Sequence, residues 1–275
     1  MAISDELKKR LLIGIPGVAL LVLLPLFGGW WGAYLISVVV GLAMLTEFAL
    51  MTFSLKDRVQ KISLLLILAF ICQIAFMLSP GTQFLIYSLV VVILAIYFLV
   101  TANRYDQNNL KLHFQELALG TFGFFYFILL MFYLPLIRNL SYGIHWVLVF
   151  FLIIWSGDTG AYFIGSRYGK TKLYPLISPK KSIEGAVGGL CLACLVISGY
   201  RLLFFPEMDL VASIVITVAV SIIAQCGDLV ASMIKRAYDA KDSGQILPGH
   251  GGFLDRFDAL VLGLPVMYVS IKILG

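Results

Sequence analysis

The sequence predicts an all-α, polytopic integral membrane protein with about nine transmembrane helices, its N-terminus cytoplasmic and its C-terminus outside. Three observations support this class. The 275 residues are 61% apolar and only 13% charged, which is about half the charged content of an ordinary soluble domain. Apolar runs recur at close to the roughly 20 residues that cross a bilayer, and the Lys and Arg residues fall mainly in alternate loops.

The apolar runs give the expected helices in order. They extend over residues 11–27, 31–53, 62–78, 84–100, 117–134, 146–164, 186–205, 210–226 and 257–274. The basic residues Lys8, Lys9 and Arg10 precede the first run, as they would in a signal peptide. That run lacks a small-x-small cleavage site, however, and eight more runs follow it, so it is expected to remain as a helix.

The orientation follows from the cationic residues, because cytoplasmic loops carry an excess of Lys and Arg. If the N-terminus is cytoplasmic, all of the 20 Lys and Arg residues except Arg138, Arg201 and Lys272 fall on the cytoplasmic side. A miscounted helix would move every later loop to the other side, so this bias favours nine spans. The protein is accordingly expected in the cell (inner) membrane as a multi-pass protein.

The chain also divides into two parts by its chemistry. Residues 1–140 are expected to form an N-terminal bundle of about five helices, whose spans carry almost no charge. Glu47 is the one acid within an early span, and near a helix end it would either extend toward the interface or bond a neighbouring helix. Residues 141–275 contain the polar segments that indicate a function.

Charge and cysteine content limit the possible functions. The net charge of +5 suits a cytoplasmic face that meets anionic lipids and anionic ligands, and nothing in the sequence suggests nucleic-acid binding. Cys191 and Cys194 form a CxxC pair inside an apolar run, with no His or second pair nearby. They are therefore interpreted as small packing residues rather than metal ligands.

The first polar segment is WSGDTGAYFIGSRYGK at residues 155–170, which places Asp158 in the cytoplasmic half of the sixth span. An ionised acid at this depth is costly, so it should face the bundle interior and meet a cation, a hydrogen-bond donor or water. The nearby Gly157, Gly160 and Gly165 permit close approach of another backbone. The alternative is a small-residue helix interface with Asp158 bonded across it.

The second segment is SPKKSIEGAVGGL at residues 178–190, ahead of the seventh span. Ser-Pro ends one element, and Ser182 or Ile183 with Glu184 is expected to begin a helix. Free N–H groups at that helix start, beside Lys180 and Lys181, would form an anion site. The same residues equally suit positive-inside lysines at a membrane edge followed by a glycine packing stripe.

The third segment, residues 225–260, is the longest. Asp228 lies just past the apolar core of the eighth span, and Ser232 and Lys235 follow it on the same helix face. Arg236 comes next, and the charged residues Lys241 and Asp242 then lead into a loop that contains PGHGG at residues 248–252.

Further charged residues lie where the ninth span begins. Asp255, Arg256 and Asp258 stand there, and the two acids share a face if the helix has begun. Several carboxylates without a Cys or His cluster suit a hard cation, Mg²⁺ above all, which takes one or two carboxylates together with water and phosphate. Glycines let backbone N–H groups hold phosphate oxygens, and Lys and Arg offset charge on a transferring group. This set therefore predicts metal-assisted phosphoryl or nucleotidyl transfer at the cytoplasmic surface.

The third segment also resembles a known signature. From Ser232 to Asp258 the chain reads S-x-I-K-R, four residues, K-D, and then H-G-G-F-x-D-R-F-D. This is similar to the signature of the phosphatidate cytidylyltransferases, or CDP-diacylglycerol synthases. GDTGAYFIG and SPKKSIEGAVGG resemble further motifs of that family, so the likeness covers most of residues 155–258. In the latter motif, Ser182-Ile183 stands where Thr-Trp or Ser-Trp is usual, so no aromatic contact is carried over.

The resemblance implies a reaction and roles for individual residues. Phosphatidic acid would attack the α-phosphorus of CTP in an Mg²⁺-dependent step that releases pyrophosphate and forms CDP-diacylglycerol for phospholipid synthesis, in an active site formed by residues 141–275 on the cytoplasmic side. Asp228, Asp255 and Asp258 would bind Mg²⁺, alone or with a second cation. The catalytic residues would be Asp228, Lys235, Asp255 and Arg256. The substrate-binding residues would be Asp158, Lys180, Lys181, Ser182, Ser232, Arg236, Lys241, Asp242, His250, Gly251 and Gly252, with His250 either contacting a phosphate or ordering its loop. A homodimer is also implied.

Two other functions remain open at this stage. A CTP-dependent lipid-alcohol kinase would use the same charges on the γ-phosphate, with Asp158 as a candidate base. A transporter or channel would use Asp158, Asp228 and Glu47 along an ion path. Transporters, however, tend to show internal repeats and polar groups near the midplane, whereas the charges of this chain gather on one side.

Overall fold

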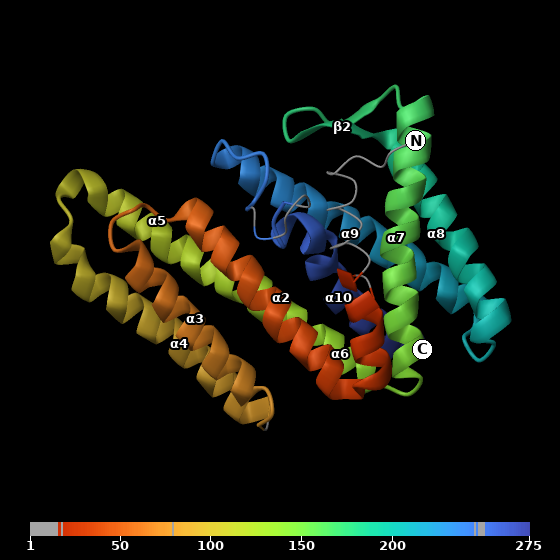
Figure 1. Cartoon of the computed structure of the whole chain (residues 1–275), viewed down its shortest axis with the longest axis horizontal. Helices are drawn as coiled ribbons and strands as arrows, with labels where there is room; N and C mark the ends of the chain where they lie inside the picture. The colour runs from red at the N-terminus through yellow and green to blue at the C-terminus, as the bar shows by residue number, and fades with distance from the viewer. Residues whose placement is uncertain (1–15, 18, 79, 245, 247–250) are drawn as a thin grey trace. The chain divides into compact units, whose positions relative to one another are not determined.

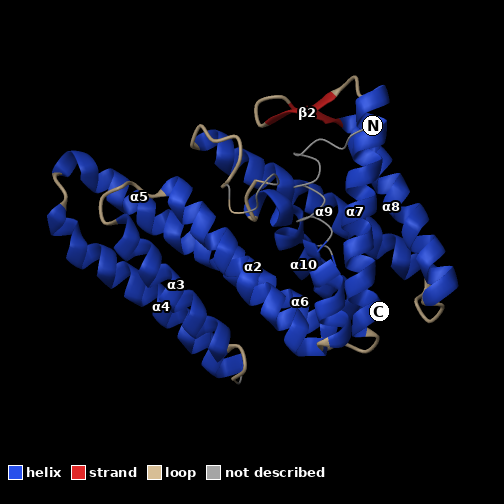
Figure 2. Ribbon diagram, viewed as in Figure 1, coloured by secondary structure: helices blue, strands red, loops and turns tan. Residues whose placement is uncertain are grey.

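The computed structural model describes residues 16–17, 19–78, 80–244, 246 and 251–275, and these are mostly helical (Figure 1, Figure 2). Eight helices in this part of the chain are long and apolar enough to cross a membrane, and they correspond to the second through ninth predicted spans. Of the first predicted span, residues 16–17 and 19–27 are described and are helical. The all-α, polytopic fold is therefore confirmed, while nine helices and the orientation of the termini stay predictions.

The elements follow in this order: α2 (Gly29–Thr52), α3 (Arg58–Ala75), α4 (Pro80–Thr101), η1 (Ala102–Arg104), α5 (Gln107–Gly123), η2 (Phe124–Leu129), η3 (Leu130–Phe132), α6 (Tyr133–Arg138), α7 (Gly143–Tyr168), β1 (Lys172–Tyr174), β2 (Ser178–Ser182), α8 (Ile183–Phe204), α9 (Leu210–Ala237) and α10 (Leu254–Leu274). By their contacts, these residues form two compact units, Val38–Leu129 (the smaller unit) and Met1–Ser37 with Leu130–Gly275 (the larger unit). The boundary near residue 140 was predicted from chemistry, and it stays a prediction.

The smaller unit contains a buried ion pair that the hydropathy pattern does not show. Lys61 Nζ lies 2.5 Å from Glu116 Oε2, and the two side chains are 1% and 0% exposed. Lys61 also donates to the Lys56 carbonyl, and the backbone N–H of Ser54 donates to Glu116 Oε1 at 2.7 Å. The pair therefore connects α3 and α5 to the loop that follows α2. Glu47 is buried within α2, so it does not extend to the interface.

The fifth predicted span differs in form from a single apolar helix over residues 117–134. The helix α5 begins ten residues earlier, where Asp106 caps it by accepting a hydrogen bond from the N–H of Asn109. The backbone then passes through the π-helix η2 and the 3₁₀ turn η3 before α6. The early start was missed because Glu116 looks like a surface residue in the sequence. In the structure its carboxylate pairs with Lys61, so it is buried within the helix.

Close packing of glycines joins α7 and α8 in the larger unit. A Cβ atom built on Gly160 would lie 2.8 Å from the Gly188 carbonyl oxygen, and one on Gly189 would lie 2.5 Å from the Gly157 carbonyl oxygen. Both distances are shorter than any real Cβ contact, so only glycine fits. The structural interpretation of these glycines is thus correct, and Asp158 on the same helix lines a pocket, described below.

The connection between α7 and α8 is a short antiparallel hairpin of β1 and β2 (Figure 2). The sequence analysis expected only a loop here, because two strands of three and five residues are too short for a clear alternating pattern. Ser182 then caps α8, and its Oγ accepts a hydrogen bond from the N–H of Gly185 at 3.1 Å. The predicted helix start is confirmed.

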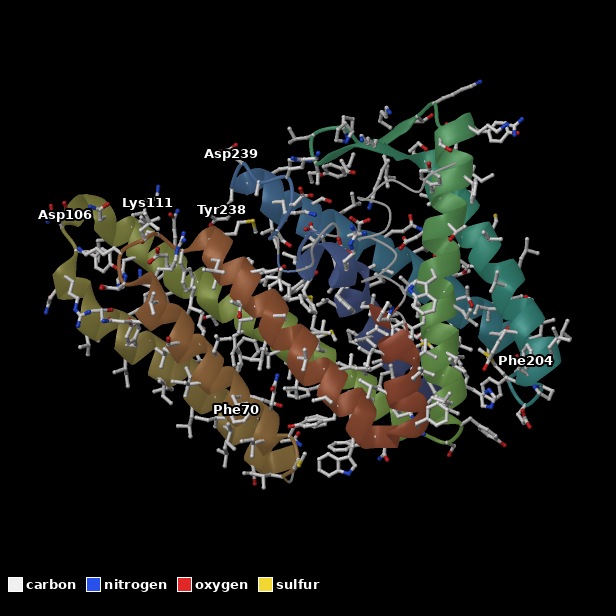
Figure 3. All side chains as sticks on the ribbon, in the orientation of Figure 1. Phe70, Asp106, Lys111, Phe204, Tyr238 and Asp239 are labelled. Atoms are coloured by element: carbon white, nitrogen blue, oxygen red, sulfur yellow. The ribbon has the colours of Figure 1, made fainter. Side chains whose placement is uncertain are left out.

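The helices of the larger unit run between two ends. From the hairpin, α8 extends to Phe204 at the opposite end, while α9 ends near Tyr238 and Asp239 (Figure 3). Asp209 caps the start of α9, where its carboxylate accepts from the N–H of Ala212, and this bond lowers the pKa of the Asp209 carboxyl. The helix continues eleven residues past the predicted apolar run, because polar residues such as Asp228 and Lys235 interrupt the apolar pattern without ending the helix.

Candidate active site

A pocket of about 420 Å³ lies in the larger unit among α7, the hairpin, α8, α9 and α10. Its polar residues include Asp158, Lys180, Lys181, Ser182 and Asp228, and apolar side chains such as Ile153, Ile154 and Ala224 line other parts of its wall. Gly157, Gly165 and Gly185 also line the pocket, and a Cβ on Gly185 would lie only 2.9 Å from the Ala161 carbonyl oxygen of α7. Residues far apart in the sequence therefore meet around one cavity.

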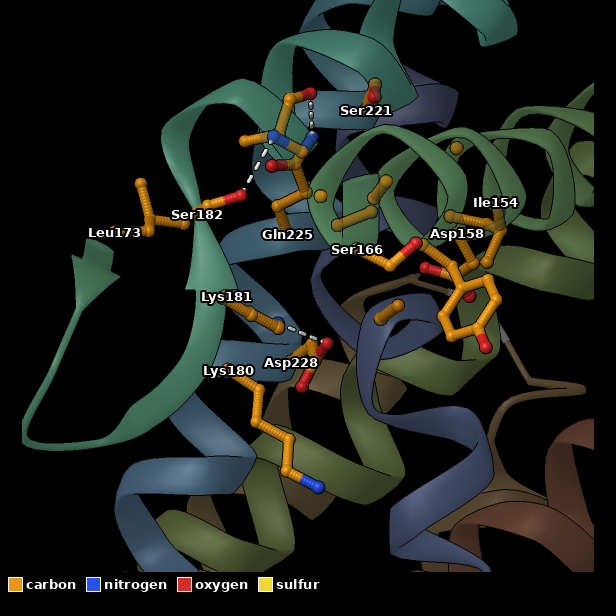
Figure 4. Close-up of a pocket in the computed structure, with 18 of the residues that line it drawn as sticks. Ile154, Asp158, Ser166, Leu173, Lys180, Lys181, Ser182, Ser221, Gln225 and Asp228 are labelled. Carbon is orange, nitrogen blue, oxygen red and sulfur yellow. Dashed lines mark hydrogen bonds and ion pairs between the residues drawn. The ribbon is translucent and has the colours of Figure 1, made fainter. Parts of the chain in front are cut away.

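An ion pair at this pocket joins the second and third polar segments. The ammonium of Lys181, on β2, contacts the carboxylate of Asp228, on α9, and both side chains are about one third exposed (Figure 4). Ser232 lies one turn further along α9 and donates to Asp228 Oδ1 at 3.4 Å. The predicted shared face of Asp228 and Ser232 is thus confirmed, and the lysine contact adds a partner that spacing could not give.

Asp158 faces the same pocket from α7. It interacts electrostatically with Asp228 and with Lys181, and none of the described side chains donates a hydrogen bond to its carboxylate. Asp158 thus lies near a cation, as expected, but its side chain is exposed at the pocket, so the expectation that it faces the bundle interior stays a prediction. Asp258, on α10, likewise interacts with Asp228, Lys181 and Lys235, so three carboxylates and two ammonium groups share one electrostatic environment.

Asp255 is the centre of a second cluster, which organises the start of α10. Its Oδ1 accepts from Lys235 Nζ at 2.6 Å, with the two side chains 10% and 12% exposed. Its Oδ2 accepts from the N–H of Ser243 at 2.8 Å, the Oγ of Ser243 at 3.1 Å and the N–H of Gly252 at 3.0 Å. The Asp255 carboxylate thus bonds Lys235 near the end of α9. It also bonds Ser243 and Gly252, which lie in the segment that connects α9 to α10.

The donor chemistry fits a hard divalent cation. Asp228 and Asp258 offer oxygen ligands close to one another, and Mg²⁺ typically needs only one or two carboxylates from the protein. Among the described residues, no three His, Cys, Asp or Glu side chains form a ready-made metal cage, and both oxygens of Asp255 already accept hydrogen bonds. The assignment of Asp228, Asp255 and Asp258 as metal ligands therefore stays a prediction.

The remaining predicted site residues differ in their exposure and in their contacts. Lys180, Arg236, Lys241, Asp242 and Arg256 have exposed side chains around this end of the larger unit. Ser182 is buried as the cap of α8, and Gly251 adopts a positive φ of 82° that favours glycine. His250 lies outside the described residues, so its role stays a prediction, while Gly252 donates its N–H to Asp255.

Sequence reasoning missed three polar residues at the site. Ser243 contributes two hydrogen bonds to Asp255, although it sits in a stretch that reads only as loop. Ser221 and Gln225 line the pocket from α9, within a run that reads as an ordinary apolar span. Ser221 lies seven residues and Gln225 three residues ahead of Asp228, and this spacing is the one signal that places these two residues and Asp228 on a common helix face.

Fold and site together define a polytopic membrane protein with a pocket bordered by acids and lysines, which is a suitable arrangement for an enzyme acting on anionic groups. The model of the cytidylyltransferase family matches residues 8–274. The chain is 34% identical to the phosphatidate cytidylyltransferase of Bacillus subtilis over 266 residues, which cover 96% of this chain and 97% of the relative.

Staphylococcal relatives agree with this assignment. The phosphatidate cytidylyltransferase of Staphylococcus haemolyticus is 41% identical over 179 residues, or 64% of this chain and 65% of the relative. That of Staphylococcus aureus strain COL is 39% identical over 175 residues, or 63% of each chain. The chain therefore belongs to the phosphatidate cytidylyltransferase family and is an enzyme of the nucleotidyltransferase class.

Proposed function

We propose that this enzyme transfers the cytidylyl group of CTP to phosphatidic acid in an Mg²⁺-dependent reaction on the cytoplasmic side of the membrane. One observation carries the proposal. Two acids and two lysines from three separate elements, α7, β2 and α9, line a pocket that also has apolar walls. A substrate with a charged phosphate and apolar chains suits such a pocket, and the names of the relatives supply the cytidylyl donor and the phosphatidate acceptor.

The reaction has a simple balance. A phosphate oxygen of phosphatidic acid attacks the α-phosphorus of CTP, the bond between the α-phosphorus and its bridging oxygen breaks, and pyrophosphate leaves. The attacking phosphate is already an anion near neutral pH, so no strong general base is needed. The main barrier is the repulsion between two anions, and fixed positive charge at the site reduces it most effectively.

The lysines of the site supply that positive charge. Lys181 is held by Asp228, and Lys235 by Asp255, so both ammonium groups are oriented before a substrate arrives and lose little entropy when they bind phosphate. The exposed Lys180, Arg236 and Arg256 would attract the triphosphate from water. Asp228 and Asp258, with Asp255, would hold Mg²⁺, which when bound offsets charge on the triphosphate and leaving group.

The cytoplasmic location of the site rests on charge. All but three of the Lys and Arg residues fall on one side if the chain has nine spans, and this excess marks the cytoplasmic side. CTP would then enter from the cytoplasm and phosphatidic acid from the bilayer. A homodimer stays a prediction, and Mg²⁺ with or without a second cation is the expected metal content.

The test is a reaction with purified protein, CTP, phosphatidic acid and Mg²⁺. Formation of pyrophosphate and CDP-diacylglycerol in equal amounts supports the proposal. Asp228→Asn should lower this turnover by at least about 100-fold, as expected when a group that positions charge for phosphoryl transfer is lost, without changing the thermal unfolding of the protein. Transfer of the γ-phosphate to a lipid alcohol, with no pyrophosphate, would instead identify a lipid kinase.

A further inference from the structure

Three polar residues on one face of α9 line the pocket, and only one of them carries charge. Ser221, Gln225 and Asp228 follow at intervals of four and three residues, so they form a row along the helix. Asp228 belongs to the charged cluster described above. Ser221 lies two turns earlier, about 10 Å further from the charged end of the helix. The pocket therefore extends from the charged cluster toward the interior of the span.

The hydroxyl of Ser221 opens onto the pocket and has no hydrogen-bond partner among the described residues. The residue is 4% exposed, and no described group bonds its Oγ. Hydroxyls within a helix usually donate to the carbonyl one turn back, as Thr217 does to Ser213 at 2.7 Å in the same helix. In Ser221 the Oγ instead faces α7, where a Cβ built on Gly157 would lie 3.9 Å away. The hydroxyl thus points across the pocket toward a residue without a side chain.

Gln225 presents a second polar group beside it. Its Nε2 donates a long hydrogen bond of 3.4 Å to the Ala186 carbonyl, which fixes the amide against α8 (Figure 4). The amide nitrogen has a second hydrogen, and no described residue accepts it. Ile153, Ile154 and Ala224 are among the apolar residues that line the same pocket. Two hydrogen-bond donors therefore open onto a partly apolar pocket, where a bound ligand without acceptors would leave them unpaired at a cost in free energy.

The position of these donors indicates what binds them. If a phosphate lies at the charged cluster, the part of the ligand that reaches Ser221 lies deeper in the membrane. In a phospholipid, the groups just below the phosphate are the glycerol backbone and its ester carbonyls, which accept hydrogen bonds and are otherwise apolar. A nucleoside would bring more polar groups than two donors can satisfy. The chemistry of this region fits a diacylglycerol backbone.

We propose that Ser221 and Gln225 donate hydrogen bonds to the ester carbonyl oxygens of the phosphatidic acid substrate, and so select ester-linked over ether-linked lipids. This rests on the proposed function, because it takes phosphatidic acid as the acceptor. Each bond joins neutral groups, so its loss should change the specificity constant by about threefold to tenfold.

The experiment compares two lipids and three variants of the full-length protein. The lipids are dioctanoyl phosphatidic acid and its dioctyl ether analogue, which lacks both carbonyls but keeps the phosphate. The variants are Ser221→Ala, Gln225→Leu, and the control Ser156→Ala. Ser156 donates to the Leu152 carbonyl within α7 and does not line the pocket. The measurements are kcat/KM for each lipid, KM for CTP, and the thermal unfolding midpoint.

The expected result is specific to the ester. The unmodified enzyme and Ser156→Ala prefer the diester over the diether, and each pocket variant loses about threefold to tenfold of that preference through a lower kcat/KM for the diester alone. An equal loss on both lipids, or a raised KM for CTP with the ester preference intact, would overturn the proposal, since the first indicates a structural role and the second a nucleotide contact.

A separate readout keeps this inference distinct from the proposed function. If the enzyme forms no CDP-lipid, the proposed function fails, and the inference is then tested by binding. Thermal stabilisation by each lipid, measured without CTP, should be greater for the diester in the unmodified protein, and this difference should be smaller in Ser221→Ala. Equal stabilisation by both lipids in the unmodified protein would overturn it.

Discussion

Replacing Asp255 by Asn tests whether this carboxylate organises the site. The substitution keeps the shape of the side chain but removes its charge and converts one acceptor oxygen into a donor NH₂ group. In the structure Oδ1 faces the ammonium of Lys235, and Oδ2 faces three donors from Ser243 and Gly252. An Asn can place its single oxygen toward only one of these sets, so its NH₂ group must face donors on the other side.

The magnitude follows from burial and charge. The Lys235 and Asp255 side chains are 12% and 10% exposed, and breaking a largely buried pair by removing one partner costs about 3–5 kcal/mol. If about 3 kcal/mol of this is lost from the local structure, opening of the segment becomes about 100-fold more frequent. The variant should also lose most of its turnover, because Lys235 is no longer held in place.

Hydrogen exchange measures this effect directly. The backbone amides of Ser243 and Gly252, which donate to Asp255, should exchange about 100-fold faster in Asp255→Asn, while amides in the middle of α9 keep their protection. Asp239→Asn is the matched control, since Asp239 is exposed at the end of α9 with a φ of 53°, a conformation that Asn adopts readily. Unchanged exchange at both amides in Asp255→Asn would refute the role of Asp255 as an organising centre.

Two further predictions concern packing and buried charge, both measured as the stability of the protein in detergent. Gly189→Ala should destabilise the protein by about 1–3 kcal/mol, because the new Cβ would lie 2.5 Å from a backbone oxygen of α7. Gly199→Ala in the same helix is the control, since its new Cβ meets nothing within 4 Å and should be tolerated. Equal effects of the two changes would contradict the packing argument. Lys61→Met should lower the free energy of unfolding by about 3–5 kcal/mol, because it leaves Glu116 buried without its cation. The double variant with Glu116→Leu should recover most of that loss of stability. A double variant as unstable as the single one would show that the ion pair is not the cause.

Much of the site was predictable because its chemistry is local in the sequence. The row from Asp228 to Ser232 depends only on helical spacing, and the Ser182 cap depends on residues three apart. Asp158 was correctly expected to lie near a cation, since an acid in a span has few alternatives. The bonds of Asp255 to Lys235 and to Ser243 were not predictable, because they depend on how a loop returns to the end of α9.

The sequence by itself determined the membrane class, the order of the apolar helices and the segments that carry the chemistry. Hydrophobic length and charge distribution act on each segment separately, so these properties can be read without knowing what packs against what. Only the tertiary structure decided which charges meet: Lys181 with Asp228, Lys235 with Asp255, and Lys61 with Glu116. It also showed that Ser221 and Gln225 face a pocket instead of lipid. These partners lie up to 55 residues apart, and their contacts depend on helix packing, which no local pattern encodes.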